Sequence, residues 1–528
     1  TLNVRTLRGE ERLEELETAI ENLKWDVIGL AEVRRNESKI IEKRNGDIFM
    51  HTAANNGQYG VGFLISNKHR NSILEFREIN CRVAVLKVIL GETKLITVVQ
   101  VHVPTAEAAD EVKIKFYDEL NKLVGSFRRK NNCIIVMGDF NGRIGERSDG
   151  EERIMGNYTH GRRNEGGTRI IDFAFSQQFI IANSYFNKNP REKWTWKSPK
   201  AQTFEIDYFL ISNRSLLKRL EVIKNLNFSS DHRMVRMEVL NDKFKKQRPF
   251  KIIKRKQRYI TEEKIETYQN KIRIKLQNKS QEDFCKPINV QSKYNRLASL
   301  LNDLITAESE ITNNKCSKLS VETKDLLEYR KKLKESNNDG VDSLTELNKL
   351  IRKNIKEDLQ KHRDAIILNT LANNKSTKQI RRELSMGKYW TVSLTDETKS
   401  TIFNRKEMLS LTTQYFRSLY DCSNDGVVRR FQTRNKDDVP EIMLAEVEEA
   451  IKTLKLNKSP GPDGLTNELL KAGGEPLYRE MCSLFNMILE KEELPEQWRT
   501  AKIILLHKKG DKKNLDNYRP ISLCSSVA

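Results

Sequence analysis

Long apolar runs are missing from this sequence of 528 residues. None approaches the roughly 18 residues that a membrane-spanning helix requires, so we expect no membrane partner. Cysteine is also sparse: the seven cysteines are far apart, odd in number and never form a Cys-x-x-Cys pair. This pattern argues against a zinc ribbon or a disulfide framework and favours a reducing compartment. No secretory signal is visible, and we expect a protein that is not secreted.

Acidic residues are outnumbered by basic ones, which gives the chain a formal net charge of +21. Residues 1–240 hold 38 Lys and Arg against 32 Asp and Glu, which leaves 56 against 41 for residues 241–528. The two parts therefore carry +6 and +15. Such a surplus favours polyanions, and nucleic acid is the usual partner. A solvated basic surface without such a partner is the alternative.

Composition divides the chain into three predicted domains. Residues 1–240 alternate strand-like apolar runs with helices, which predicts a layered α/β domain. Residues 241–390 predict a basic, mainly helical connector that opens with a basic arm or linker over 241–260 and contains one long helix over 343–371. Residues 391–528 predict a short hairpin, helices and a strand with basic flanks. Because the chain starts at Thr1 and stops inside a motif at SSVA, we expect a fragment at both ends.

Polar residues recur against the short apolar runs of the first domain. Glu32 ends the apolar stretch of DVIGLAEVR, Asp139 ends that of NNCIIVMGDFNG, and Asp207 lies inside FEIDYFLI. A carboxylate placed against an apolar strand is costly unless a metal ion, a cation or hydrogen bonds satisfy it. The repeated placement predicts one shared metal site at one end of a sheet.

These residue types suit the hydrolysis of a phosphodiester, which needs positioning, charge neutralisation and an activated water. Asp139 and Asn141 are two residues apart, so in an extended chain both point to the same side. His232 could donate to the phosphate or handle the proton, and Asp207 could fix its tautomer. Taken singly, an Asp-His dipeptide or Gly-Asp-Phe-Asn is more often a surface loop or a turn. The order and number of the pieces carry the hypothesis.

The ordered motifs NVRTL, LAEVR, GVGFL, VHVPT, MGDFNG, WTW, IDYFLI and SSDHR resemble the endonuclease/exonuclease/phosphatase superfamily. More narrowly, residues 1–240 resemble the apurinic-like endonuclease domain of non-LTR (LINE-type) retrotransposons. The resemblance implies a four-layer α/β sandwich of two packed sheets and a Mg²⁺ cofactor, with Mn²⁺ as the alternative. The metal residues that it implies are Asn3, Glu32 and Asp231. The catalytic residues that it implies are Asp139, which orients or activates the water, Asn141, which assists it, and the pair Asp207 and His232 at the scissile phosphate. Thr195 and Trp196 match a loop that borders the DNA.

One position departs from the family pattern. His102 stands where the family usually has a tyrosine that hydrogen-bonds the phosphate, and Thr105 stands where it often has an asparagine. A histidine can still donate a hydrogen bond, so we count His102 among the catalytic residues.

The C-terminal segment carries a second chemistry. WRTAKIILLHKKGDKKNLDNYRPISL surrounds a short apolar strand with cations that could hold a template backbone or a triphosphate, and a plain basic hairpin is the alternative. The candidate nucleic-acid-binding residues are Lys502, Lys508, Lys509 and Arg519. Together with KSPGPDGLTNELLK, this segment resembles the fingers region that opens a non-LTR reverse transcriptase, with YRPIS as its signature. The sequence has no aromatic-x-Asp-Asp box of the palm. The pair Asp437-Asp438 lies upstream of the fingers, in the wrong context for this box. We therefore expect that this chain as given cannot polymerise.

The order nuclease, basic connector, polymerase resembles the open reading frame of an RTE-like LINE element, a group that includes craniofacial development protein-like sequences. The resemblance implies a nickase that leaves a 3′-hydroxyl for target-primed reverse transcription. Its partners would be double-stranded target DNA and the element RNA, with synthesis in the cytoplasm and action in the nucleus. The alternative is a catalytically decayed remnant that only binds nucleic acid. The fingers segment disfavours a small-molecule phosphatase and a dedicated abasic-site repair enzyme.

Overall fold

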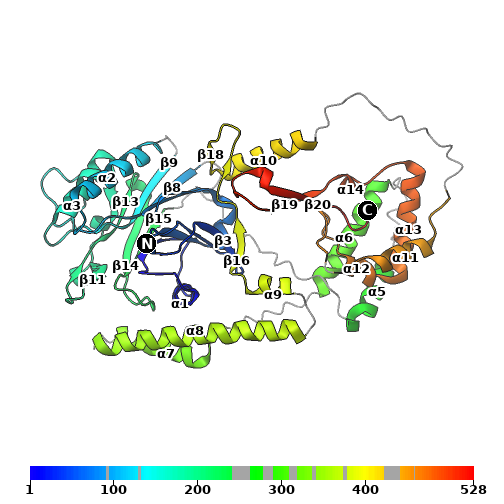
Figure 1. The fold of residues 1–528 in the computed structure, drawn as a ribbon, viewed down its shortest axis with the longest axis horizontal. Helices are drawn as coiled ribbons and strands as arrows, with labels where there is room; N and C mark the ends of the chain where they lie inside the picture. The colour runs from blue at the N-terminus through cyan, green and yellow to red at the C-terminus, as the bar shows by residue number, and fades with distance from the viewer. Residues whose placement is uncertain are drawn as a thin grey trace. The chain divides into compact units, whose positions relative to one another are not determined.

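The computed structural model describes residues 1–90, 94–128, 132–240, 262–277, 289–308, 318–335, 341–372, 377–420, 440–456 and 458–528. The described residues up to 240, together with 318–414, form one compact unit, and the other described residues form a second (Figure 1). The basic arm predicted over 241–260 and the Asp437-Asp438 pair lie outside the described residues. The domain boundaries at 240 and 390 stay a prediction.

Two six-stranded sheets form the centre of the first unit. The first sheet has the order β1 (Leu2–Asn3), β2 (Val27–Ala31), β5 (Val61–Ile65), β4 (Ile48–His51), β3 (Lys39–Lys43) and β16 (Gly387–Trp390). The second has the order β10 (Ile180–Ile181), β13 (Asp207–Ile211), β9 (Asn132–Asp139), β8 (Lys94–His102), β7 (Val83–Leu90) and β6 (Ile73–Asn80). The pairs β1–β2 and β8–β9 are parallel, and the other pairs are antiparallel.

The sheets pack face to face and each is covered by helices on its outer face. One core joins apolar side chains of both sheets, among them Phe63 of β5 and Ile135 of β9. A second core lies between the second sheet and the helices α2 (Asp110–Gly125) and α3 (Glu165–Ser176). A third lies between the first sheet and α1 (Glu10–Ile20), which buries Leu13, Leu16 and Ile20 as its helical spacing predicts. The predicted α/β class, with two packed sheets between helices, is confirmed.

Shorter elements complete the described part of the chain up to residue 240. Two small ribbons are β11 (Trp196–Lys197) with β12 (Thr203–Phe204), and β14 (Leu217–Ile223) with β15 (Met234–Val239). The short helix α4 (Pro190–Lys193) precedes the first ribbon.

Residues after 318 contribute further elements to the first unit. Strand β16 pairs antiparallel with β3 at the edge of the first sheet, and Trp390 Nε1 donates to Glu42 Oε2 over 3.0 Å. The helices α7 (Val321–Glu335) and α8 (Val341–Ala372) pack against each other, and α8 contacts α1 (Figure 1). Helix α8 confirms the long basic helix predicted over 343–371. Helix α9 (Thr377–Leu384), the predicted hairpin, β17 (Leu394–Thr395) with β18 (Thr401–Ile402), and α10 (Arg405–Tyr420) follow, and the first unit ends within α10 at Gln414.

The second unit is mainly helical. Its helices are α5 (Glu262–Gln277), α6 (Val290–Glu308), α11 (Leu444–Thr453), α12 (Asn467–Ala472), α13 (Gly474–Lys491) and α14 (Glu496–Arg499), followed by a hairpin of β19 (Lys502–His507) and β20 (Tyr518–Leu523). Asp463 of the PGPDG turn accepts hydrogen bonds from Tyr294 at 2.6 Å and Ser525 at 2.5 Å, which ties the turn to α6 and to the chain after β20. Across the described parts of the chain, every helix is too short or too polar to cross a membrane.

Candidate active site

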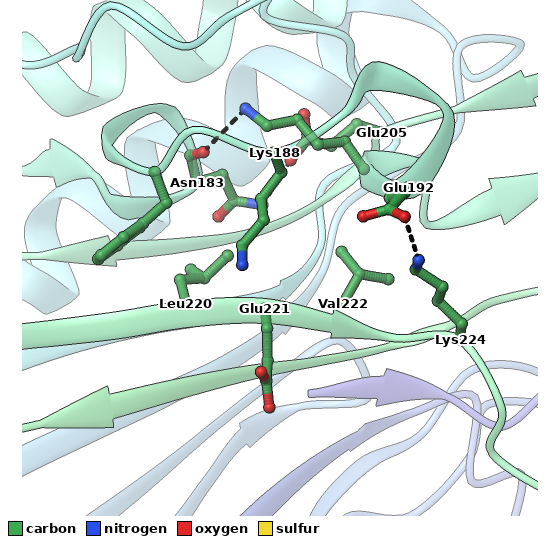
Figure 2. A pocket seen from close by; sticks show the side chains of 10 residues that line it. Asn183, Lys188, Glu192, Glu205, Leu220, Glu221, Val222 and Lys224 are labelled. Atoms are coloured by element: carbon green, nitrogen blue, oxygen red, sulfur yellow. Dashed lines mark hydrogen bonds and ion pairs between the residues drawn. The ribbon is translucent and has the colours of Figure 1, made fainter.

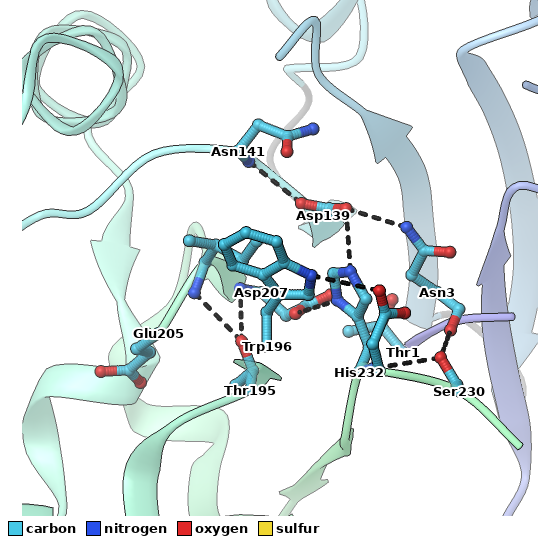
Figure 3. A network of polar contacts seen from close by, with 12 residues as sticks. Thr1, Asn3, Asp139, Asn141, Thr195, Trp196, Glu205, Asp207, Ser230 and His232 are labelled. Carbon is cyan, nitrogen blue, oxygen red and sulfur yellow. Dashed lines mark hydrogen bonds and ion pairs between the residues drawn. The ribbon is translucent and has the colours of Figure 1, made fainter. Parts of the chain in front are cut away.

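The ends of four strands bring amide and acidic side chains together at one end of both sheets (Figure 3). Asn3 ends β1, and Glu32 directly follows the neighbouring strand β2. Asp139, the last residue of β9, lies opposite Asp207, the first residue of β13. The sequence predicted a site at the end of one sheet. The structure draws it from two, because the packed sheets place these strand ends side by side.

Asn3 bridges two carboxylates across the sheets. Its Nδ2 atom donates to Glu32 Oε1 over 2.9 Å and to Asp139 Oδ2 over 3.0 Å. Burial acts to raise the pKa of Glu32, but the hydrogen bonds from Asn3 and Arg34, together with the charge of Arg34, outweigh it and hold this pKa below its usual range. Glu32 also has a φ of 57°, a left-handed conformation that costs a residue with a side chain about 1–3 kcal/mol. The fold thus places an ionised carboxylate here at some conformational cost.

His232 stands between two aspartates. Its Nδ1 atom lies 2.9 Å from Asp207 Oδ2, and its Nε2 atom lies 3.8 Å from Asp139 Oδ2. Burial alone would lower the pKa of His232, but Asp207, Asp139 and Asp231 raise it to about 9. Burial raises the pKa of Asp139 above its usual range, and the nearby Asp207 adds to this effect. At neutral pH the imidazole is therefore cationic, and Asp139 is suited to accept a proton.

Two buried side chains hold the backbone of Asp207 in place through hydrogen bonds. The hydroxyl oxygen of Thr195 accepts the N–H groups of Ile206 at 3.0 Å and Asp207 at 3.1 Å, and Asn183 Nδ2 donates to the Asp207 carbonyl over 3.0 Å. Thr195 is fully buried. The sequence placed Thr195 at the DNA, and a direct contact with DNA stays a prediction. The structure shows a residue that positions the start of β13.

Trp196 lies beside the same site. Its ring centroid is 6.3 Å from that of His232, and its Nε1 atom is 3.4 Å from Asp231 Oδ2. Trp196 is half-buried, so part of it is exposed to solvent. This position suits the predicted border with DNA, which stays a prediction.

Asn141 reaches the site through a sharp turn after β9. Its φ is 49°, so the chain here is not in the extended conformation that had been expected from the sequence. Its backbone N–H donates to Asp139 Oδ1 over 3.0 Å, and its side-chain Nδ2 donates to the Val103 carbonyl over 2.8 Å. Asp139 is therefore oriented by donors on both oxygens, from Asn141 and from Asn3.

His102 ends β8 and lies opposite Asp139 in the parallel pair β8–β9. Its Nε2 atom is 3.8 Å from Glu32 Oε1 and 4.0 Å from Asp139 Oδ2. Burial lowers the pKa of His102, and the neighbouring carboxylates only partly offset this, so the ring is neutral. The Tyr59 ring lies 6.0 Å away from the His102 ring, a neighbour that no sequence motif had indicated.

Ser230 and Asp231 connect the last motif to the first. The Ser230 hydroxyl donates to the Asn3 carbonyl over 2.8 Å and accepts the His232 N–H at 3.0 Å. Asp231 Oδ1 lies 3.6 Å from Arg5 Nε. Sequence reasoning missed Ser230, although serine directly before Asp-His is a signal because its hydroxyl readily bonds nearby backbone groups.

The donor set fits a divalent cation. Carboxylate oxygens of Asp139 and Asp207 lie within 4.8 Å of each other and of a ring nitrogen of His232, which as a cation would not itself bind the metal. Asp207 Oδ1 is buried without a hydrogen-bond partner, and Glu32 adds an ionised carboxylate nearby. Hard oxygen donors and net negative charge suit Mg²⁺ or Mn²⁺. The structure brings Asn3 and Glu32 together as predicted, and metal ligation by Asn3, Glu32 and Asp231 stays a prediction.

Two hollows lie near these residues. One of about 160 Å³ lies between α4 and β14, and its lining includes Asn183, Lys193 and Glu205 (Figure 2). Burial raises the pKa of Glu205 to about 7, and Asn183 links it to the Asp207 backbone. The other, of about 190 Å³, includes Asn141 in its lining.

The four predicted cations of the fingers segment belong to the second unit. They lie on the two strands of the hairpin β19–β20 or in the connection between them, and all are exposed: Lys502, Lys508, Lys509 and Arg519. Their exposure on a two-stranded ribbon is compatible with either a nucleic-acid contact or a plain basic surface.

Known proteins are similar to separate parts of this chain. Residues 1–232 match the Endonuclease/Exonuclease/phosphatase family. "Craniofacial development protein 2" of Tragulus javanicus is 26% identical over 238 residues, which are 44% of this chain and 41% of that protein. The "Probable RNA-directed DNA polymerase from transposon BS" of Drosophila melanogaster is 41% identical over 88 residues, which are 16% of this chain and 10% of that protein. The chain thus covers about two fifths of the length of the first of these curated relatives and one tenth of the second.

A solved structure is also similar. The 3′ phosphatase NExo from Neisseria, bound to a product DNA hairpin, superposes with a TM-score of 0.34 at 16% sequence identity, covering 45% of this chain and 97% of that one.

Proposed function

We propose that this chain, whose residues 1–232 form a hydrolase domain of the endonuclease/exonuclease/phosphatase family, is a metal-dependent DNA endonuclease of a LINE-type element. It nicks one strand of double-stranded target DNA and leaves a 3′-hydroxyl and a 5′-phosphate. The observation that carries this proposal is the placement of His232, with one ring nitrogen on Asp207 and the other facing Asp139.

The reaction follows from these contacts. Asp139, held by Asn141 and Asn3, orients a water molecule and takes its proton as the water oxygen bonds to phosphorus. The bond from phosphorus to the 3′ oxygen breaks, and that oxygen takes a proton from solvent. The cationic His232 donates to a phosphate oxygen, where charge develops.

A divalent cation held by Glu32, Asn3 and Asp231 would neutralise charge on the phosphate, with Mg²⁺ as the first choice and Mn²⁺ as the alternative. Glu32 supplies the ionised carboxylate, and Asn3 orients it. His102 would donate to the phosphate in place of the family tyrosine.

The second unit supports a role in retrotransposition. Similarity of an 88-residue stretch to the transposon BS polymerase supports a reverse-transcriptase origin for part of the chain. The 3′-hydroxyl of the nick would prime copying of the element RNA, and exposed cations of the β19–β20 hairpin would hold the template backbone. Action on chromosomal DNA places this step in the nucleus.

The test is relaxation of supercoiled plasmid with Mg²⁺, with Mn²⁺ and with EDTA. We expect nicking only with metal, and nicks that a DNA polymerase extends without prior end repair, because the 3′ end is a hydroxyl. Asp139→Asn should abolish nicking, whereas Asp149→Asn, on an exposed loop, should not. Absence of nicking with either metal, or full nicking by Asp139→Asn, would overturn the proposal.

A decayed remnant that only binds nucleic acid is the second candidate, and His102 in the place of the family tyrosine favours it. A gel shift without cleavage, in both Mg²⁺ and Mn²⁺, would select this candidate.

A further inference from the structure

Helix α7 lies beyond the family match, yet it holds the loop that leads into Asp231 and His232. Arg330 donates from Nη2 to the Asn227 carbonyl and from Nε to Asn227 Oδ1, both over 2.8 Å. Lys334 Nζ donates to the carbonyls of Leu226 at 3.1 Å and Phe228 at 2.7 Å. Three successive residues of the loop are thus bound by two cations of one helix.

The same arginine anchors a buried network on α1. Arg330 has no exposed surface, and its Nη1 atom donates to Glu15 Oε1 over 2.6 Å. Glu15, itself buried, also pairs with Arg12 and accepts the Ser229 N–H at 3.0 Å. Arg12 then donates to the carbonyls of Ser229 at 2.7 Å and Val4 at 3.2 Å. A fully buried ionic network costs desolvation, and removal of one partner leaves an uncompensated buried charge, so the groups that it holds are sensitive to its loss.

Both ends of this network stop one residue short of the active site. Ser229 precedes Ser230, which binds the Asn3 carbonyl and the His232 N–H. Val4 follows Asn3, which bridges Glu32 and Asp139. A displacement of the loop would therefore move His232 and Asn3 relative to each other.

We propose that Arg330 is a positioning residue of the nuclease: through the 226–229 loop and Glu15 it sets the place of His232 and Asn3. The expected effect on nicking rests on the proposed nuclease function, whereas the contacts that position His232 and Asn3 do not. It extends the working nuclease beyond the family domain into α7, so that the segment after the nuclease is part of its active-site support.

The test uses the full chain with Arg330→Met, which leaves Glu15 its partner Arg12. The matched control is Lys331→Met, an exposed residue of the same helix. We expect Arg330→Met to lower kcat of nicking about 10- to 100-fold, the scale of a roughly 1 Å misplacement, with KM changed less than about twofold. Lys331→Met should leave both constants unchanged. Should Arg330→Met fail to fold, Lys334→Met, which removes two loop contacts and spares Glu15, takes its place.

A spectroscopic measurement separates positioning from general stability. The His232 imidazole N–H that bonds Asp207 should give a low-field proton resonance in the wild type. We expect this resonance to shift or broaden in folded Arg330→Met and to persist in Lys331→Met. An unchanged resonance together with unchanged kcat would overturn the inference. A wild-type protein that does not nick would overturn the proposed function alone, because the resonance still tests the positioning.

Discussion

The Nδ1 atom of His232 lies 2.9 Å from the Oδ2 atom of Asp207, and this contact turns the opposite ring nitrogen toward Asp139. The aspartate does two things at once. It holds the orientation of the ring, and it favours the cationic form in a place where burial alone would disfavour it.

Removal of this imidazole should therefore slow nicking strongly. We expect His232→Gln to lower kcat by about 10²- to 10⁴-fold, the usual scale for a group that handles a proton or donates in the transition state. His69→Gln is the matched control, because His69 pairs with Asp26 on the surface. Plasmid nicking under single-turnover conditions measures both, and a less than tenfold loss in His232→Gln would contradict the assigned role.

The raised pKa of His232 also predicts a pH-dependent stability. A folded pKa of about 9, against about 6.5 in the unfolded chain, contributes stability that is fully present below about pH 6.5 and is lost as the pH rises through about 9. In EDTA, the free energy of unfolding of the wild type minus that of His232→Gln should stay constant below this window and shrink across it. Urea unfolding at several pH values tests this, and a difference that grows with pH would contradict it.

Glu32→Gln should weaken metal binding rather than abolish the chemistry. The substitution removes a charge but keeps the shape, so we expect the Mg²⁺ concentration for half-maximal nicking to rise about 10- to 100-fold, with kcat largely recovered at saturating metal. Glu37→Gln is the matched control, because Glu37 is exposed and pairs with Lys39. Direct titration with Mn²⁺ in the absence of DNA should show the same change in affinity. Equal affinity in the two variants would argue against ligation by Glu32.

Thr195→Val tests whether the Thr195 hydroxyl positions Asp207 through its backbone hydrogen bonds. The change keeps the volume but leaves the N–H groups of Ile206 and Asp207 without an acceptor, which should cost about 1–3 kcal/mol of unfolding free energy. Because Asp207 is one of these residues, kcat should fall as well. Thr97→Val, another buried threonine whose hydroxyl bonds Asn132, should cost stability without lowering kcat. Equal kcat losses in both variants would show that stability alone is being measured.

The hairpin of the second unit predicts salt-dependent binding of nucleic acid. Replacing Lys508, Lys509 and Arg519 with alanine should weaken RNA binding and lower the slope of log affinity against log salt by about 0.7 for each lost phosphate contact. Arg479→Ala is the control, because Arg479 is exposed on α13 and pairs with Glu475. A slope that stays at the wild-type value would assign these cations to a plain basic surface.

The pattern of apolar residues predicted the positions of the strands well, but it predicted only part of how their ends come together at the site. The runs around Asp139 and Asp207 are strands because apolar side chains continue up to or beyond a carboxylate, and this is visible in the sequence. That the site needs two sheets was not visible, because strand order depends on packing between segments far apart in the chain. The left-handed backbone at Asn141 was missed for a related reason: the turn is set by its hydrogen bond to Asp139, not by residue type alone.

Ion pairs between residues far apart in the sequence were the hardest contacts to predict. Glu15 reads as one more exposed acid of an amphipathic helix, yet it is buried against Arg330. Nothing in the periodicity of either helix marks these two residues as partners. The ion pair forms because the fold brings α7 next to α1, although the two helices are far apart in the sequence.

Strand β16 has a practical consequence for the nuclease. It occupies the edge of the first sheet beside β3, where Trp390 donates to Glu42 and its ring contacts the guanidinium of Arg405. A protein cut back to residue 240 would present the β3 edge bare, and an uncovered edge strand is a template for pairing with another copy. Self-association of a shortened nuclease would then report a missing strand rather than a natural dimer.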